Sequence, residues 1–242
     1  MRTWKEVHEA GRLAFRRFRY WRQQWIVRQF ARLYYGSPLR EDLTKGTTWR
    51  DGITTWLGVP CEKCPLDLWI YQELIFRTRP DLIVECGVNY GGSAFYYASI
   101  MDILKQGEII GIDITFRHLY PEVKAHPRIS LHESNSTDPA IVEVVRQRVA
   151  GRRTMVILDS DHSLAHVRRE MELYADFVTP GCYLVVEDTN VNGHPVLPEH
   201  GPGSYEAVRE FLTTRKDFVI DRDQHKYLMT WNPNGYLRRL LY

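Results

Sequence analysis

The sequence predicts an α/β fold in which helices cover both faces of a mostly parallel sheet. From Pro80 onward, short apolar runs alternate with segments of helical periodicity. The runs are continuously apolar rather than alternating, as strands buried on both faces require. The last two runs flank a polar turn, which indicates an antiparallel hairpin at the end of the sheet. At 242 residues the chain can bury a full core without disulfides or a structural metal.

The predicted elements follow from periodicity and from flanking glycine and proline residues. Helices are expected at residues 65–78, 93–105, 140–149, 163–177 and 204–214. Strands are expected at residues 82–84, 109–112, 129–131, 155–158 and 183–186. The terminal hairpin is expected to pair residues 218–220 with residues 227–231 across the polar segment 221–225.

The N-terminal segment differs from the rest in charge. Residues 1–40 hold ten Lys and Arg against two Glu, a balance of +8, which leaves −6 on the remainder of the chain. Residues 5–35 lack proline, and Phe18, Trp21 and Trp25 recur at three- and four-residue steps, so one or two helices are expected. A loop over residues 36–48 follows. We therefore predict a basic amphipathic helical arm at residues 1–46 and a main domain at residues 47–242.

The partner of this arm stays open from sequence. Arg12, Arg16 and Arg19 share one helix face. The favoured interpretation is packing on the main domain or on a second subunit of a homo-oligomer, and the alternative is peripheral contact with a membrane through residues 1–40. Nucleic-acid binding is not expected, because no other part of the chain extends the basic surface. No span of about 20 apolar residues and no apolar leader is present. We therefore expect a cytoplasmic protein, with the inner membrane face as the alternative site of contact.

The four cysteines are too few for a disulfide framework in a chain of this length. Cys61 and Cys64 form a C-x-x-C pair, but a structural zinc site needs a second pair or two matched histidines. We expect neither a zinc site nor a redox role for this pair.

A glycine-rich turn follows the first predicted strand. Gly87, Gly91 and Gly92 permit close approach of a ligand to the backbone, and Ser93 can cap the next helix. The turn is neither a dinucleotide fingerprint nor a Walker A motif. Glu85, at the end of the strand, repels phosphates but can pair with the cationic group of an amino-acid ligand.

Polar residues also follow the next two strands. Asp113 stands where an acidic side chain binds ribose hydroxyls, and the polar run 132–136 offers groups for an adenine edge. Ribose, adenine and a charged amino acid without phosphates describe S-adenosylmethionine (SAM) better than a dinucleotide. The predicted cofactor-binding residues are Glu85, Gly87, Asn89, Gly91, Gly92, Ser93, Asp113, Ser134, Ser136 and Asp159.

Carboxylates cluster after the fourth and fifth strands. Like charges at neighbouring strand ends need a neutralising group, and hard oxygen ligands without cysteine favour Mg²⁺, Mn²⁺ or Ca²⁺. His162 suits a general base beside such a cation, or it could join His166 or His194 in a two-histidine, one-carboxylate iron site. The predicted metal ligands are Asp159, Asp161, Glu187 and Asp188, and the predicted catalytic residues are His162 and Asp161.

Several segments in combination resemble the cephalosporin hydroxylase family over about residues 47–240. The segments that carry the resemblance are residues 54–60, 89–93, 159–163, 185–193 and 232–237. Members of this family look like class I SAM-dependent methyltransferases, and relatives include rhamnosyl O-methyltransferases and Mg²⁺-dependent macrolide sugar O-methyltransferases. The resemblance implies a Rossmann-like, seven-stranded sheet and Mg²⁺ held by Glu187, Asp188 and one further acid. The spacing of the macrolide sugar enzymes selects Asp159 as that acid, with His162 as base, whereas the spacing of the cephem enzyme selects Asp161.

These observations predict a Mg²⁺-dependent SAM O-methyltransferase acting on a hydroxyl of a sugar, a glycolipid or a glycosylated natural product. The acceptor is thus a small molecule or a glycan. One alternative, suggested by the family name, is a non-haem iron oxygenase of a small metabolite, and another is a catalytically silent binding module. The Pro- and Gly-rich segment 192–203 is interpreted either as a substrate-binding flap or as an ordinary surface connection.

Overall fold

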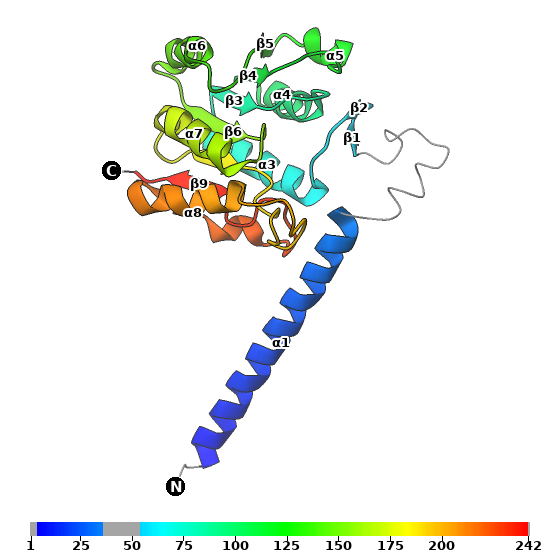
Figure 1. Ribbon diagram of the computed structural model, residues 1–242, viewed down its shortest axis with the longest axis vertical. Coiled ribbons are helices and arrows are strands. Elements are labelled where there is room, and N and C mark those ends of the chain that lie inside the picture. The colour runs from blue at the N-terminus through cyan, green and yellow to red at the C-terminus, as the bar shows by residue number, and fades with distance from the viewer. Residues whose placement is uncertain (1–3, 36–53, 242) are drawn as a thin grey trace.

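The computed structural model describes residues 4–35 and 54–241. Its centre is a seven-stranded sheet of order β5-β4-β3-β6-β7-β9-β8 (Figure 1). The parallel strands are β3 (Leu82–Cys86), β4 (Glu108–Asp113), β5 (Ile129–Glu133), β6 (Thr154–Leu158) and β7 (Tyr183–Val186). Strand β9 (Tyr236–Arg239) runs antiparallel to both β7 and β8 (Phe218–Ile220), which closes the sheet with a hairpin.

Helices cover both faces of this sheet, as the continuously apolar strands predict. The strands send alternate side chains to opposite faces, so Ile83 joins one apolar cluster while Leu82 and Val84 join the other. The first face is covered by α3 (Pro65–Thr78), α4 (Gly92–Leu104) and α5 (Pro121–Lys124). The second face is covered by α6 (Pro139–Val149), α7 (Leu164–Tyr174) and α8 (Ser204–Thr214). A small two-stranded sheet of β1 (Thr55–Trp56) and β2 (Val59–Pro60) precedes α3, and 3₁₀ turns lie at Ala175–Phe177 and Arg222–His225.

The second strand of the hairpin is not the one predicted. Residues 227–231 form an irregular loop, and the strand that pairs with β8 and β7 is β9, further along the chain. The loop is tied elsewhere: Thr230 Oγ1 and the Trp231 amide both donate hydrogen bonds to the Asp67 carboxylate of α3. Tyr236 and Leu237 are fully buried, whereas Tyr227 and Leu228 are exposed. Burial therefore selects the later, shorter apolar run as the strand.

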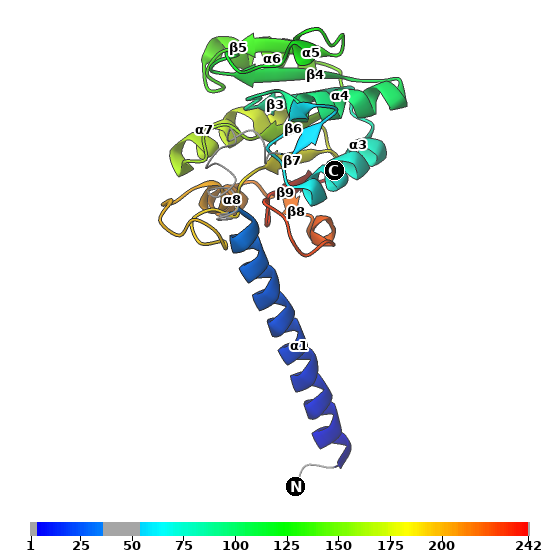
Figure 2. The same ribbon diagram turned by 90° about the vertical axis from the view of Figure 1, so that its right-hand side faces the viewer.

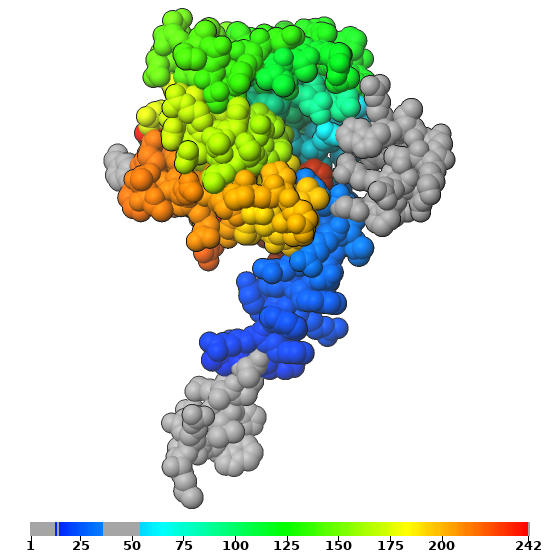
Figure 3. All heavy atoms as spheres, in the orientation of Figure 1, coloured from blue at the N-terminus to red at the C-terminus, as the bar shows by residue number. Residues whose placement is uncertain are grey.

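The N-terminal arm is a single helix, α1 (Trp4–Tyr35), that projects away from the sheet (Figures 1 and 2). Its C-terminal end meets the body, where Ala31 is buried and Arg32 Nε donates to the Pro195 carbonyl at 2.9 Å (Figure 3). Trp21 is 65% exposed. Among the side chains of α1 that the structure describes, those of the last turns pack on the main domain.

Basic and apolar side chains are intermixed on α1. At 3.6 residues per turn, Arg19 falls between Ile26 and Phe30 on the helix surface. The helix is therefore basic but only weakly amphipathic. No helix among the described residues is long and apolar enough to cross a membrane. The loop predicted at residues 36–48 lies outside the described residues.

Candidate functional site

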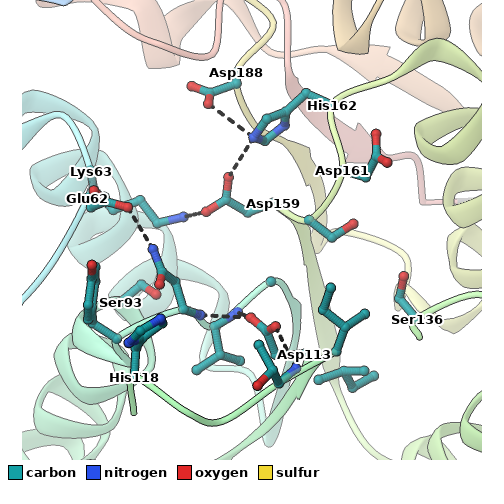
Figure 4. A pocket seen from close by; sticks show the side chains of 18 of the residues that line it. Glu62, Lys63, Ser93, Asp113, His118, Ser136, Asp159, Asp161, His162 and Asp188 are labelled. Atoms are coloured by element: carbon teal, nitrogen blue, oxygen red, sulfur yellow. Dashed lines mark hydrogen bonds and ion pairs between the residues drawn. The ribbon is translucent and has the colours of Figure 1, made fainter. Parts of the chain in front are cut away.

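A cavity of about 660 Å³ opens at the carboxyl ends of β3, β4, β5 and β6 (Figure 4). The chain order of the strands reverses between β3 and β6, and open α/β sheets bind ligands at such a switch point. The cavity is lined by eight of the ten residues that the sequence predicts as cofactor-binding: Gly87, Asn89, Gly92, Ser93, Asp113, Ser134, Ser136 and Asp159.

The glycines of the turn after β3 are required by close contacts. A Cβ on Gly87, which has φ +91°, would lie 1.9 Å from the Asp159 carbonyl oxygen. A Cβ on Gly92 would lie 2.2 Å from the Pro60 carbonyl oxygen. Gly91 does not line the cavity, since a Cβ there would meet Leu119 and Val123 at 2.7 Å in the interior. The turn is thus packed between β6 and β2 and leaves backbone exposed to the cavity.

Asp113 ends β4 and holds this turn in place. One of its carboxylate oxygens accepts hydrogen bonds from the amides of Val88 and Asn89, both at 2.8 Å, and the other accepts from the Thr115 amide at 3.2 Å. A carboxylate offers about four acceptor positions. Asp113 therefore keeps capacity for one hydroxyl of a ligand.

The residues after β5 form a second polar wall of the cavity. Ser136 Oγ lies 3.1 Å from His166 Nε2, and the Ser136 carbonyl accepts from Tyr174 at 2.6 Å. Glu170 contacts both His166, at 3.4 Å, and Ser160, whose hydroxyl donates at 2.7 Å. The hydrogen bond to Glu170 raises the pKa of His166, against the effect of burial. This wall joins the loop after β5 to α7.

A buried lysine that no sequence motif marks, Lys63, lies in the wall of the cavity. Lys63 is 3% exposed and donates to both Asp159 and Glu187, the latter at 2.5 Å, while Glu85 lies 4.0 Å away. Burial alone would lower the pKa of Lys63, but the three carboxylates outweigh it and raise that pKa well above its ordinary value. Tyr71 also donates to Glu187, at 2.6 Å. The carboxylates at the strand ends are thus partly neutralised by a cation of the chain itself.

Burial dominates the titration of these acids. It raises the pKa of Glu85 to about 8, with Lys63 opposing the rise. Burial, reinforced by Asp159, raises the pKa of Glu187 to about 7. Neither oxygen of Glu85 has a hydrogen-bond partner among the described residues, and Glu85 does not line the cavity. The cation that Glu85 faces in this structure is therefore Lys63.

One group of ligand atoms at the cavity is arranged as a cation site requires. Oxygens of Asp159 and Asp188 and a nitrogen of His162 all lie within 4.8 Å of one another. His162 Nε2 is 3.2 Å from Asp188 and 4.0 Å from Asp159 (Figure 4). Burial raises the pKa of both carboxyl groups, and His162 opposes the rise in each. The two carboxylates repel one another, and most of the ligand atoms in the group are oxygens. Both features fit a hard divalent cation.

The other two predicted metal ligands, Asp161 and Glu187, have further partners in the structure. Asp161 accepts from the Ser163 amide at 2.7 Å, in a turn that leads into α7, and that hydrogen bond lowers its pKa. Glu187 is held by Lys63 and Tyr71 on the buried side of the strand end. Of the four predicted acids, Asp159 and Asp188 meet at His162.

The segment 192–203 lies outside the cavity lining. His194 contacts Glu206 of α8 at 2.9 Å, and Glu206 accepts from the Gly203 amide at 2.8 Å. The segment thus packs on the start of α8 and, through Pro195, on the end of α1.

The sheet order, the glycine turn, the acid after β4 and the cavity at the switch point together define a class I methyltransferase fold. The family model described as "Rhamnosyl O-methyltransferase/CmcI" matches residues 49–240. The chain belongs to this family, and it is a SAM-dependent O-methyltransferase.

Curated relatives align over most of the chain. The rhamnosyl O-methyltransferase of Mycobacterium tuberculosis (strain ATCC 25618 / H37Rv) is 39% identical over 220 residues, which cover 88% of this chain and 85% of that protein. The protein of the same name from Mycobacterium leprae (strain TN) is 37% identical over 222 residues, with 88% and 90% covered.

Solved structures confirm the fold. An apo-structure of CmcI superposes with a TM-score of 0.62 at 22% identity, covering 81% of this chain and 79% of that chain. A CmcI structure described as "Mg-SAM" superposes with a TM-score of 0.61 at 23% identity, covering 78% and 77%.

Proposed function

We propose that the protein uses SAM and Mg²⁺ to methylate a hydroxyl of a sugar, a glycolipid or a glycosylated natural product. The observation that carries this proposal is one cavity with a glycine turn and Asp113 on one wall and the Asp159–His162–Asp188 group on another. The names of the curated relatives support a rhamnosyl acceptor. The CmcI structure described as "Mg-SAM" supports the cofactors.

The residues that line the cavity divide between the parts of the cofactor. We assign Asp113 to one ribose hydroxyl and Ser134 and Ser136 to the adenine edge. The amino-acid end would lie at the glycine turn, near Asn89 and Ser93. Glu85 and Gly91 would support the cofactor site without touching the cofactor, since both lie outside the cavity lining.

Asp159 and Asp188 would hold the cation, with His162 beside them. A bound divalent cation supplies polarisation of the acceptor hydroxyl and lowers its pKa by several units. Asp161 and Glu187 stay predicted ligands from the sequence, although the structure gives them other partners.

His162 is the group placed to take the proton of the acceptor hydroxyl. Its Nε2 atom is the one that faces the two carboxylates at the cavity. Asp188 lies 3.2 Å from the same nitrogen, so Nε2 could accept a proton only when the Asp188 carboxylate is engaged by a cation instead. Asp161 braces the turn that carries His162, because it accepts from Ser163 at the start of α7.

Asp159→Asn and Asp188→Asn test the proposal. Each variant should lose activity on the order of a hundredfold or more, because the cation that activates the hydroxyl is lost. The assay follows methylation of p-nitrophenyl α-L-rhamnoside by mass, and calorimetry measures SAM affinity, which should stay within a few-fold in Asp188→Asn. Asp223→Asn, an exposed acid of the second 3₁₀ turn, is the matched control.

The outcomes separate the competing functions. A gain of CH₂ in the product supports methyl transfer, whereas a gain of one oxygen supports the iron oxygenase. Failure to bind SAM supports the silent module. Activity that is unchanged in both variants and indifferent to chelation would remove the cation from the mechanism. Greater loss in Asp161→Asn than in Asp159→Asn would favour the spacing of the cephem enzyme.

We also propose that residues 47–242 form the catalytic domain, that residues 1–46 form an appended arm, and that the protein is a homo-oligomer. The exposed aromatic residues of α1, including Phe18, Trp21 and Trp25, support a partner for the arm. A cytoplasmic location and a peripheral membrane contact through residues 1–40 stay predictions of the sequence.

A further inference from the structure

Two aromatic residues from distant parts of the chain meet at the cavity. Tyr35, at the end of α1, and Trp231, in the loop before β9, both line it. Their ring centroids are 5.3 Å apart with an interplanar angle of 74°, which is edge-to-face packing. Tyr34 lies 6.2 Å from the same Trp231 ring. The end of the arm and the loop thus form one aromatic surface.

The main chain at Trp231 is fixed by hydrogen bonds to buried groups. Its amide donates to Asp67 at 2.8 Å, and its carbonyl accepts from the Asn190 amide at 3.1 Å. Asp67 is buried, and it accepts from Tyr236 at 2.7 Å. Burial raises the pKa of Asp67 to about 6 despite these hydrogen bonds. Trp231 is therefore held in place before any ligand arrives.

This aromatic surface is also tied to Asp188, a predicted metal ligand. Asn232, the residue after Trp231, is fully buried and accepts through its side-chain oxygen from the Asp188 amide at 3.0 Å. Asp188 is the carboxylate that contacts His162. The peptide bond from Trp231 to Asn232 and the hydrogen bond from Asn232 to Asp188 therefore connect the Trp231 residue to the Asp188 carboxylate.

The arm end is anchored on the other side of the surface. Arg32 Nε donates to the Pro195 carbonyl at 2.9 Å, and Ala31 is buried one residue earlier. The curated relatives align over 88% of the chain, although residues 49–242 make up only about four fifths of it. That alignment therefore includes part of the segment before residue 49, where the end of α1 lies.

We propose that Tyr35 and Trp231 form the acceptor subsite, on which the apolar face of a neutral sugar ring stacks. The axial C–H groups on one face of a pyranose are weakly positive and meet the negative face of an aromatic ring. The hydroxyls at the ring edge are then free to reach Asp188 and His162 on the same cavity. In this arrangement the last turn of α1 completes the active site. The inference rests on the proposed function and names the residues that select its acceptor.

The experiment uses the full-length protein with SAM, Mg²⁺ and p-nitrophenyl α-L-rhamnoside. Trp231→Ala and Tyr35→Ala should each raise the KM for the rhamnoside roughly three- to tenfold with kcat within about twofold, because stacking binds ground and transition state alike. Saturation-transfer NMR should show the sugar-ring protons contacting the wild-type protein and losing that contact in both variants. SAM affinity, measured by calorimetry, should not change.

Controls separate stacking from folding. Trp69→Ala removes a tryptophan that is 59% exposed on α3, and Tyr20→Ala removes a tyrosine that is 65% exposed on α1. Both should match the wild type in KM. Trp231→Phe retains an aromatic face and should restore most of the affinity lost in Trp231→Ala.

The outcomes also keep the two proposals apart. Product formed by the wild type with an unchanged KM in Trp231→Ala and Tyr35→Ala overturns the subsite and leaves the proposed function intact. Saturation transfer that depends on both residues, without any methylated product, supports the subsite and overturns the function. Absence of transfer to the wild-type protein overturns the subsite.

Discussion

Removal of the buried Lys63 ammonium should destabilise the fold in a way that depends on pH. Lys63 is 3% exposed and pairs with Asp159, Glu187 and Glu85, of which Glu85 is fully buried. Lys63→Met retains an unbranched side chain of similar length but deletes the charge. Three carboxylates then lose their shared cation.

Loss of one partner from a buried ion pair costs about 3–5 kcal/mol, because an uncompensated charge stays buried. For a chain of 242 residues, 1 kcal/mol corresponds to roughly 2–4 °C in melting temperature. The expected fall in Tm at alkaline pH is therefore roughly 6–20 °C. The lower end applies if water reaches Asp159, which is the most exposed of the three acids.

The cost should shrink as the pH falls. Burial already raises the pKa of Glu187 to about 7 and of Glu85 to about 8, and loss of Lys63 raises both pKa values further. The native variant then binds protons that its unfolded form does not bind. Its stability therefore decreases as the pH rises from about 6 to about 8.

Thermal melts of Lys63→Met and wild type at about pH 6 and about pH 8 measure both effects. Lys124→Met, which alters an exposed lysine at the end of α5, is the matched control and should melt with the wild type. Added Mg²⁺ should restore part of the lost Tm, since a bound cation replaces the missing charge. Equal melting of Lys63→Met and wild type at both pH values would refute the role of Lys63 as the internal counter-ion.

Two further predictions concern the turn and the surface. Gly87→Ala should lower Tm and weaken SAM binding at least about tenfold, because the new Cβ would lie 1.9 Å from backbone. Gly151→Ala, at a similarly positive φ but with no atom within 4 Å, should retain SAM affinity, and equal losses in both would point to strain alone. Arg215 lowers the pKa of Asp217 by hydrogen bonding, so that carboxylate stabilises the fold above the ordinary Asp pKa of about 4 and this contribution disappears as the pH falls. Asp217→Asn should therefore melt lower than wild type near neutral pH, and the gap should narrow as the pH falls below about 4; a gap that does not narrow would contradict this.

The sequence predicts the parallel part of the sheet closely, because strands buried on both faces are continuously apolar and are easily identified. The strand at Tyr183–Val186 and the helices at Pro65–Thr78 and Ser204–Thr214 match their predicted bounds. Only the second strand of the hairpin was wrong. There, a tether to Asp67 outweighs the aromatic character of residues 227–231, and no pattern within the segment reports such a tether.

The site is predicted in part, for a geometric reason. Strand order alone brings Asp113, Asp159 and Asp188 to one edge of the sheet, so acids after strands can be identified from sequence. Which of two adjacent acids, Glu187 or Asp188, faces His162 depends on the backbone conformation at each residue. Asp188 has a left-handed φ of +50°, which turns it toward His162, while Glu187 continues the strand toward Lys63.

No motif or periodicity in the sequence marks Lys63 as a buried counter-ion. It lies between two cysteines before α3, far along the chain from the acids that it neutralises. The clustered acids predict a neutralising cation, but their pattern does not distinguish a bound metal ion from a lysine elsewhere in the chain. The four acids at these strand ends have room for two cations: the Lys63 ammonium and a metal ion bound by Asp159 and Asp188.

The two ends of α1 have physically separate roles in this structure. The last turn contacts the body through Ala31 and Arg32 and places Tyr35 at the cavity, whereas Phe18 and Trp21 are exposed on the projecting part. Exposed aromatic side chains grouped on one helix are typical of an interaction surface, and a partner proposed for that surface need not touch the active site. Deletion of residues 1–40 would remove both features together. If the proposed subsite is right, that deletion raises the KM for the acceptor through the loss of Tyr35. The partner of the arm therefore has to be sought with changes confined to the first turns of α1.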